Sequence, residues 1–283
     1  MKNTLTGIAV ISLSFAIAAG CSAATTDLPI ALQMYTLRND GSLEQQFALA
    51  QRAGFHAVEL VSDQGVTAHE MKRLLGKYHL QPIADHVQLE DLENHSATIV
   101  AFNKAIGNKT LVMPWIKPDV RPDSKQSWQQ MGQRLDAIGK QLKAQGMTLA
   151  YHNHNFEMKK YDGQTALDIL MSSSHPEHLK LELDAAWASR GGQDPAVILQ
   201  RYKGRIFAIH AKDNASIGIR DDEMNFAPAG EGLLAWNEIM PAAKAAGVQW
   251  YIVEHDKPNN EAEAIITESN KFLQQQLSRE GVK

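Results

Sequence analysis

The stretch that decides the fold is 179-LKLELDAAWASRGGQDPAVILQRYKGRIFAIHAKD-213. It begins with an apolar run, continues with an amphipathic segment from residue 194, and ends with a second apolar run over 206–213. The dipeptide Asp194-Pro195 is a helix start, because Asp caps the first amide groups and Pro fits the first helical position. A strand, a helix and a strand in this order predict two parallel strands joined by a crossover helix.

The same unit repeats along the chain without a linker or low-complexity gap. The predicted strands are 30–36, 57–60, 82–87, 110–115, 148–154, 179–187, 206–213 and 250–256. The predicted helices are 43–54, 67–79, 91–107, 124–146, 164–174, 194–204, 236–247 and 261–281. Eight pairs in about 250 residues predict an α/β fold, a single-domain (β/α)₈ TIM barrel. An open doubly wound sheet would more typically carry a Gly-rich first turn, and the first run continues to Leu37-Arg38 without glycine.

The first 21 residues, MKNTLTGIAVISLSFAIAAGC, have the layout of a bacterial export signal. Cys21 is the only cysteine and follows Ala-Ala-Gly, which resembles a lipobox whose Cys becomes the lipidated first residue. We therefore expect a signal peptide over 1–21, a tether over 22–28 and the barrel domain over 29–283. The expected location is the periplasmic face of the outer membrane as a lipoprotein, or the soluble periplasm if the signal is simply cleaved.

Composition narrows the classes of partner. Apolar residues make up 44% of the chain and charged residues 21%, and the net charge is −4, which is ordinary for a globular domain with a sizeable core. A nucleic-acid-binding protein would show a basic surplus gathered in a stripe. We therefore expect a small-molecule partner, no nucleic acid, and membrane contact only through a lipid anchor. The oligomeric state does not follow from the sequence.

Polar side chains gather at the ends of the last four predicted strands, where TIM-barrel active sites lie. They are His152 and His154, Asp184, His210 and Glu254. Because side chains alternate along a strand, each of these strands offers an inward position near its end. Two carboxylates and two imidazoles in a barrel mouth would be unfavourable without a compensating cation. Mixed nitrogen and oxygen ligands indicate one divalent metal ion, and Mn, Zn, Co, Fe and Mg all remain open.

Seven motifs in order resemble the xylose isomerase-like TIM barrel family, the sugar phosphate isomerase/epimerase group, in its YHNH subset. They are 31-ALQMYTLRND-40, 54-GFHAVEL-60, 151-YHNHNFEM-158, 181-LELDAAWASRGGQDP-195, 206-IFAIHAKD-213, 230-GEGLLAW-236 and 251-YIVEHD-256. The similarity covers almost all of residues 29–280, and with the N-terminal signal the chain resembles an exported lipoprotein member.

The resemblance implies one metal ion held by His152, Asp184, His210 and Glu254. Sugar epimerases of this group usually carry Glu at the strand-five position, where it is also a catalytic base. Here that position is His, so either the base is lost or its role moves to a residue such as His154, with Glu254 and Lys212 as further catalytic candidates. His154 also remains the alternative to His152 as a ligand.

Five further residues are candidates for contact with the substrate. Glu59 and His86 end the second and third predicted strands, with local hydrogen bonding as the alternative role. Trp115 and Trp187 could form an apolar platform for a sugar ring, with core packing as the alternative. Arg190 follows the sixth strand beside two glycines and could anchor a loop or a polar ligand.

Three functions are compatible with this arrangement. A metal ion next to a sugar carbonyl acidifies the adjacent C–H bond, and return of the proton elsewhere gives an isomerase or epimerase, which is the function expected first. Loss of a β-oxygen substituent instead gives a lyase, and related proteins eliminate the aglycone from 3-keto-glycosides, a substrate class suited to the periplasm. A non-catalytic, metal-dependent sugar-binding lipoprotein is the third alternative.

Overall fold

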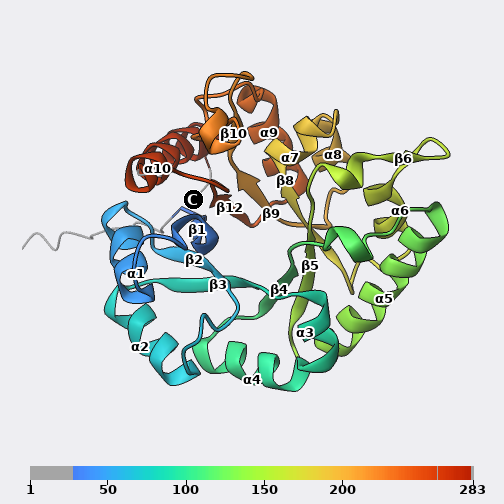
Figure 1. The fold of residues 1–283 in the computed structure, drawn as a ribbon, viewed down its shortest axis with the longest axis horizontal. Helices are drawn as coiled ribbons and strands as arrows, with labels where there is room; N and C mark the ends of the chain where they lie inside the picture. Colours follow the sequence, from blue (N-terminus) through green and yellow to red (C-terminus); the bar gives the residue numbers. More distant parts are fainter. Residues whose placement is uncertain (1–27, 260, 282–283) are drawn as a thin grey trace, which may run out of the picture.

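The computed structural model describes residues 28–259 and 261–281, so the expected signal peptide, Cys21 and most of the tether lie outside the described residues. Eight parallel strands close into a barrel in the order β1-β2-β3-β4-β5-β8-β9-β12, with helices around it (Figure 1). The strands are β1 (Ile30–Gln33), β2 (Ala57–Val61), β3 (Gln81–His86), β4 (Thr110–Met113), β5 (Thr148–His152), β8 (Lys180–Asp184), β9 (Ile206–Ala211) and β12 (Trp250–Val253). The predicted TIM barrel is confirmed.

Each predicted helix is present. The helices are α1 (Leu43–Arg52), α2 (Ala68–Lys77), α3 (Leu89–Asn94), α4 (Ser96–Ile106), α5 (Lys125–Ala144), α6 (Ala166–Ser172), α7 (Ala185–Arg190), α8 (Pro195–Arg201), α9 (Trp236–Ala246) and α10 (Ala262–Arg279). Asp194 caps α8 by accepting a hydrogen bond from the Ala196 amide, with Pro195 at the first helical position as predicted. None of the helices in the described part of the chain combines the length and apolarity that a bilayer span requires.

The structure corrects several predicted boundaries. The predicted strands 110–115, 148–154, 206–213 and 250–256 end earlier, at Met113, His152, Ala211 and Val253. Three further corrections have a local cause. The first strand ends at Gln33, whose side chain accepts a hydrogen bond from the Tyr35 amide and starts a 3₁₀ turn over Met34–Leu37. The sixth strand ends at Asp184, because the Asp184 carboxylate accepts from the Trp187 amide and caps α7. The helix predicted over 91–107 is divided between α3 and α4 by the non-helical backbone of His95.

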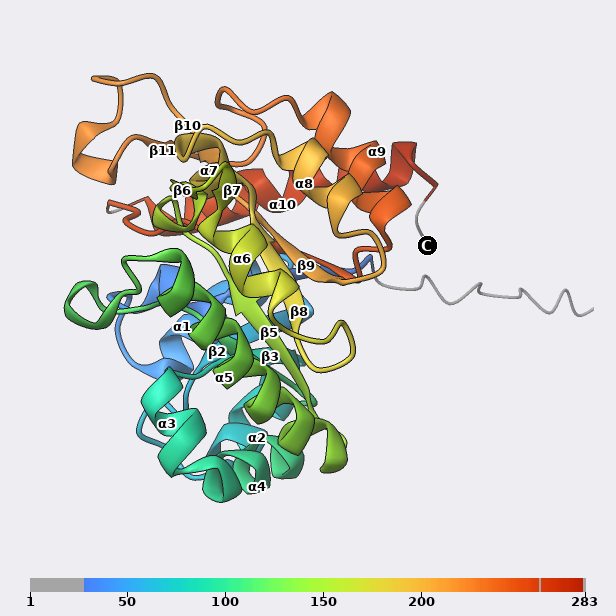
Figure 2. The same cartoon turned by 90° about the vertical axis from the view of Figure 1, so that its right-hand side faces the viewer.

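Two short hairpins that the sequence did not predict extend from the barrel. They are β6 (Lys160–Tyr161) with β7 (Gln164–Thr165), and β10 (Asp213–Asn214) with β11 (Phe226–Ala227). Each follows the carboxyl end of a barrel strand, so both stand on that side of the barrel (Figure 2). We call the end of the barrel where the strands' carboxyl ends lie the mouth.

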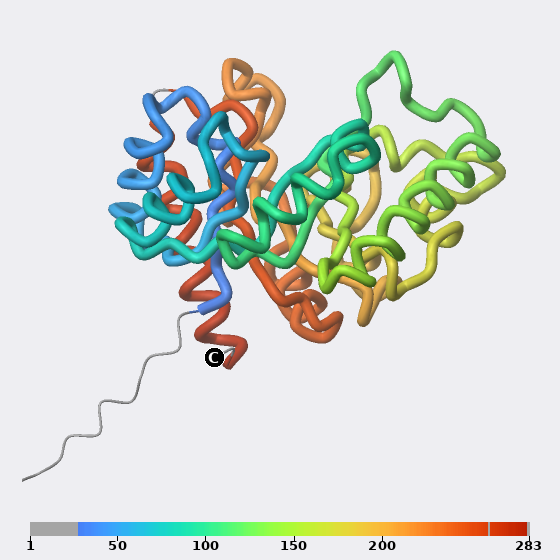
Figure 3. Tube along the Cα trace, turned by 90° about the horizontal axis from the view of Figure 1, so that it is seen from below, coloured from blue at the N-terminus to red at the C-terminus, as the bar shows by residue number. Residues whose placement is uncertain are grey.

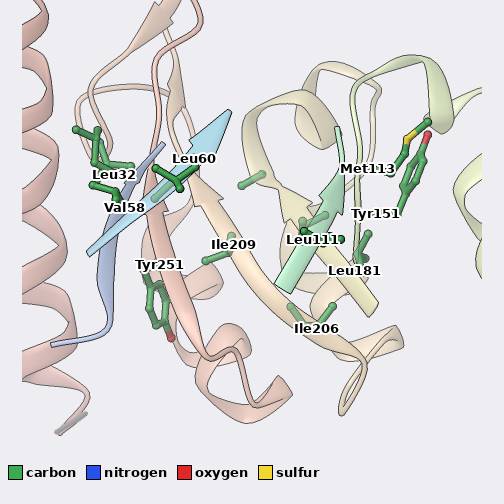
Figure 4. Close-up of a cluster of buried hydrophobic side chains, with 14 of the residues drawn as sticks. Leu32, Val58, Leu60, Leu111, Met113, Tyr151, Leu181, Ile206, Ile209 and Tyr251 are labelled. Carbon is green, nitrogen blue, oxygen red and sulfur yellow. The ribbon is translucent and has the colours of Figure 1, made fainter. Parts of the chain in front are cut away.

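The apolar core has two layers, because strand side chains alternate between the barrel interior and the helices. Outward side chains such as Leu32, Leu60, Leu111 and Ile209 are fully buried in the larger layer (Figure 4), and each contributes about 1.5–3 kcal/mol when buried. The smaller cluster inside the barrel consists of Ala31, Ala57, Ile83, Ala84, Val112, Ala150, Phe207, Ala208 and Ile252. Five of these nine residues are alanines, so the side chains of this cluster are mostly small.

The barrel closes where its first and last strands pair. Ile30 to Leu32 of β1 lie beside Tyr251 to Val253 of β12 in parallel register. The same region brings β1 against α10, and the two ends of the described chain run side by side (Figure 3). This closure places the end of β12 among the other strand ends at the mouth.

Candidate metal centre

Four neighbouring strands bring the predicted ligands together. His152 ends β5, Asp184 ends β8, His210 lies near the end of β9, and Glu254 directly follows β12. One donor atom from each of the four lies within 4.8 Å of the others, and all four residues are buried. The set that the resemblance implied is therefore assembled at one point of the mouth.

The donors suit a divalent cation. His210 Nδ1 lies 3.0 Å from Glu254 Oε2, and His152 Nε2 lies 3.8 Å from Asp184 Oδ2. Asp184 Oδ2 is buried, and the Lys212 ammonium lies 2.9 Å from it. Two imidazole nitrogens and two carboxylate oxygens form a donor set that Zn²⁺, Mn²⁺, Fe²⁺ and Co²⁺ accept. These residues could hold such an ion.

Lys212 is a fully buried cation beside this donor set. Its Nζ lies 2.9 Å from Asp184 Oδ2, 2.5 Å from Glu254 Oε2 and 2.5 Å from Asp256 Oδ2. The sequence placed Lys212 among the catalytic candidates but did not single out Asp256, which lies two residues beyond Glu254 at the same strand end. The ammonium compensates the negative charge of three carboxylates that burial would otherwise make unfavourable.

A second set of polar side chains adjoins the first, and we call Glu59, His86 and Glu182 the inner polar layer; Glu59 and Glu182 are fully buried, whereas His86 also reaches the cavity. Glu182 Oε1 lies 3.1 Å from His152 Nδ1, 2.9 Å from His210 Nε2 and 3.0 Å from His86 Nε2. Glu59 Oε2 lies 2.8 Å from His210 Nε2 and accepts a hydrogen bond from Gln33. Glu182 shares the strand parity of Asp184, and this parity was the one signal in the sequence that could have found it.

Burial and neighbouring charges shift the pKa values of the site in different directions. Burial, aided by the charge of His210, lowers the pKa of His152 to about 3. Burial alone would lower the pKa of His86, but the carboxylates of Glu59 and Glu182 outweigh it and raise that pKa to about 10. Burial raises the pKa of Asp184 to about 6, although the Lys212 charge opposes the shift. His152 is therefore a neutral imidazole near pH 7, the form that binds metal ions.

The polar residues around His152 build a rigid turn. The Asn153 side chain accepts a hydrogen bond from the Asp184 amide at 3.0 Å and donates to the Asp184 carbonyl at 3.3 Å, which joins β5 to β8. The buried Glu157 carboxylate accepts from the Tyr151 hydroxyl at 2.6 Å and from the His154 amide at 2.9 Å. This turn holds His154 above the donor set, with its ring centroid 5.1 Å from that of His152.

A cavity of about 650 Å³ opens above the donor set. Its walls include the aromatic side chains Tyr35, Trp115, Phe156 and Trp187, the cationic side chains Arg38, Arg121 and Lys257, and at its base His86, His152, His154, Glu254 and Asp256. A cavity of this size and mixed lining fits a polar small molecule with apolar faces.

The five predicted substrate contacts divide into two groups. Trp115, Trp187 and His86 line the cavity, whereas Glu59 is fully buried below it. Arg190 lies behind the wall, where its guanidinium donates to Asn214 Oδ1 and to the Met224 carbonyl and stacks on Phe226. Arg190 therefore holds a loop and does not line the cavity, and its expected contact with a polar ligand stays a prediction.

Sequence comparison agrees with this architecture. The family profile described as xylose isomerase-like TIM barrel matches residues 47–276. The chain belongs to this family. An inosose dehydratase from Lacticaseibacillus casei is 25% identical over 143 residues, which are 46% of this chain and 47% of that protein. The chain thus matches about half the length of this curated relative of the family.

Solved structures of this family support the fold. A sugar phosphate isomerase/epimerase from Parabacteroides distasonis ATCC 8503 superposes with a TM-score of 0.75 at 20% identity, over 89% of this chain and 96% of that one. The IOLI protein, solved with a bound zinc atom, superposes with a TM-score of 0.69 at 17% identity, over 89% of this chain and 99% of that one. Identities this low establish the shared barrel and no more.

Proposed function

We propose that this xylose isomerase-like protein is a metal-dependent enzyme that moves a proton next to the carbonyl group of a sugar or keto-sugar, with isomerisation or epimerisation as the outcome. The observation that carries the proposal is the convergence of four buried nitrogen and oxygen donors within 4.8 Å. They lie at the base of a cavity large enough for a sugar. The IOLI protein, which shares the barrel, was solved with a bound zinc atom, and this supports a metal-dependent function.

In this proposal His152, Asp184, His210 and Glu254 hold the ion. A divalent cation at this position would supply Lewis acidity that stabilises the negative charge of an enediolate. His154 stands outside the four-residue set and is the candidate base. The His154 residue lines the cavity, and its buried Nδ1 has no hydrogen-bond partner among the described residues.

The aromatic side chains of the cavity would orient the substrate. The ring centroids of His154 and Trp187 lie 5.4 Å apart, which places an apolar wall beside the candidate base. Arg121 lies over the Phe156 ring at 3.5 Å and brings a cation to the same wall. Apolar sugar faces stack on such rings while hydroxyl groups remain free to meet the charged side chains.

A lyase is the second candidate, favoured by one feature of the site. The end of β5 offers imidazoles where epimerases of the group usually have a carboxylate base, so the donor set lacks that base. In an elimination His154 would take the proton from the carbon beside the carbonyl, and the carbon–oxygen bond one carbon further would break. The curated relatives are inosose dehydratases, whose name describes such a loss.

The lyase alternative agrees with the location that the N-terminal sequence predicts. An exported lipoprotein of the YHNH subset would meet glycosides and oxidised sugars outside the cytoplasm, and 3-keto-glycosides carry both the carbonyl group and the oxygen substituent that elimination needs. In that case the cavity would hold the sugar ring together with part of the aglycone.

Incubation of the purified protein with a panel of keto-sugars and 3-keto-glycosides in D₂O tests these proposals, with NMR and mass spectrometry as readouts. We expect one divalent ion per chain and metal-dependent deuterium incorporation beside the carbonyl. An epimerised product supports the first candidate, and a released aglycone supports the second. Binding without exchange would instead indicate the non-catalytic sugar-binding protein and contradict both.

The His154→Gln variant separates the base from the ligands. If His154 is the base, the variant retains its metal ion and loses deuterium exchange by about two to four orders of magnitude. The matched His152→Gln variant should lose the metal ion. If instead His154→Gln loses the metal ion and His152→Gln retains it, His154 is the ligand and His152 the candidate base.

A further inference from the structure

We infer that Glu182 is a positioning residue that orients both imidazole ligands of the proposed metal centre. The inference rests on the proposed function, because it concerns the residues that would hold the ion. Glu182 lies on β8 two residues before Asp184, and its side chain is fully buried. It is not one of the four proposed ligands, although it belongs to a second compact donor group, His86, His152, Glu182 and His210, and it does not line the cavity.

The sheet order places Glu182 between the two imidazoles. Strand β8 pairs with β5 on one side and with β9 on the other. His152 is the register partner of Glu182, and His210 is the register partner of Asp184. A single oxygen, Glu182 Oε1, consequently lies 3.1 Å from His152 Nδ1 and 2.9 Å from His210 Nε2.

These contacts decide which nitrogen of each ring can face a metal ion. A carboxylate only accepts hydrogen bonds, and a neutral imidazole has one N–H group and one free lone pair. If His152 donates from Nδ1 and His210 donates from Nε2, the lone pairs remain on His152 Nε2 and His210 Nδ1. These two nitrogens face Asp184 and Glu254, at 3.8 Å and 3.0 Å respectively.

Glu182 would therefore hold the His152 ring directly through the Nδ1 hydrogen bond and share His210 Nε2 with Glu59, which keeps both rings in the orientation and tautomer that metal binding requires. Hydrogen bonds from ligating imidazoles to a carboxylate behind them typically change metal affinity about 10- to 100-fold. Glu59 provides an internal comparison, because Glu59 Oε2 lies 2.8 Å from His210 Nε2 and contacts only one of the two ligands. Its removal should reduce metal affinity less.

The test is a graded series of amide substitutions in the full chain, with the Kd for Zn²⁺ measured by competition against a chromogenic chelator. We expect Glu182→Gln to weaken Zn²⁺ binding about 10- to 100-fold and Glu59→Gln to weaken it less. Asp85→Asn should leave it unchanged, because Asp85 is a buried carboxylate on β3 whose hydrogen bond goes to Asn103 rather than to the imidazoles.

The absorption spectrum of the metal centre distinguishes a positioning role of Glu182 from a purely structural one, because a purely structural role would leave that spectrum unchanged. In Glu182→Gln loaded with Co²⁺, the d–d absorption bands should shift relative to the wild type, and in Asp85→Asn they should not. An unchanged Kd and spectrum in Glu182→Gln would overturn the inference. Two ions per chain in the wild type and one in Glu182→Gln would also overturn it, because Glu182 would then be a ligand.

A measurement on the wild type covers the case in which Glu182→Gln does not fold. Long-range ¹H–¹⁵N NMR of the Zn²⁺-loaded protein should show His152 protonated at Nδ1 and His210 protonated at Nε2. The opposite tautomer at either ring would overturn the inference. A wild type that binds no divalent ion would defeat the proposed function as well, whereas tight wild-type binding with an unaffected Glu182→Gln would defeat this inference alone.

Discussion

The two halves of the barrel have the same architecture and different interiors. Strands β1 to β4 bring two ionisable side chains to the barrel interior, Glu59 and His86. Strands β5, β8, β9 and β12 bring His152, Glu182, Asp184, His210 and Glu254, with Lys212 and Asp256 close by. Because these four strands are neighbours in the sheet order, their polar ends lie side by side around one part of the mouth.

The two halves of the barrel therefore contribute differently to the site. The second half concentrates donor atoms that depend on one another for charge compensation, whereas the ends of the first four strands supply cavity walls through residues such as Tyr35, Ser62 and Trp115. A charged group removed from the second half should therefore disturb its neighbours, and one removed from the first half should act alone. Four substitutions test this comparison.

Lys212→Met should have the largest effect. It removes the buried ammonium beside Asp184, Glu254 and Asp256 and leaves buried carboxylates without their counter-charge. We expect the free energy of unfolding of the chelator-treated protein to fall by about 3–5 kcal/mol, measured by urea denaturation. Zn²⁺ should restore part of the loss, because the ion would supply positive charge at the same carboxylates. An unchanged unfolding free energy would mean that the carboxylates do not depend on Lys212.

Asp85→Asn should have an intermediate effect that depends on pH. Asp85 lies on β3, and burial raises its pKa to about 6. When a carboxyl group has a higher pKa in the folded than in the unfolded chain, the free energy of unfolding of the protein falls as the pH rises from about 4 to 6. The Asp85→Asn variant lacks this carboxyl group and its pH-dependent loss. Its free energy of unfolding relative to that of the wild type should therefore rise by about 2–3 kcal/mol between pH 4 and pH 7, because one pKa unit corresponds to about 1.4 kcal/mol. A stability difference independent of pH would contradict the raised pKa.

Helix caps should show the smallest effect and no difference between the halves. Ser42 caps α1 by accepting from the Gln45 amide, and Asp194 caps α8 by accepting from the Ala196 amide. We expect Ser42→Ala and Asp194→Ala each to lower the free energy of unfolding by about 1 kcal/mol. If Asp194→Ala lowers the free energy of unfolding much more than Ser42→Ala does under the same conditions, the second half is sensitive to substitutions outside its charged interior as well.

The predictable part of the site came from strand parity. His152, Asp184, His210 and Glu254 could be assigned to one point because strand ends in a parallel barrel meet at one mouth and alternate residues point inward. Lys212 was found by the same parity. Glu182 shares that parity too, but it lies two residues before the strand end, where the other three strands carry an apolar or small inward residue. Asp256 ends the predicted run 250–256 at the parity of Glu254, so the same signal could have found it.

The amino-acid sequence alone determined the barrel, since the order of apolar runs and amphipathic segments, with caps such as Asp194-Pro195, depends on local periodicity. It also determined which strand ends carry donor atoms. Only the tertiary structure decided that Glu182 lies between His152 and His210, that Lys212 contacts three carboxylates, and that Glu59 lies below the cavity rather than in its wall. These relations depend on distances between strands that are remote in the chain, and on side-chain reach within a closed barrel. Neither of these is encoded in the pattern of any single segment.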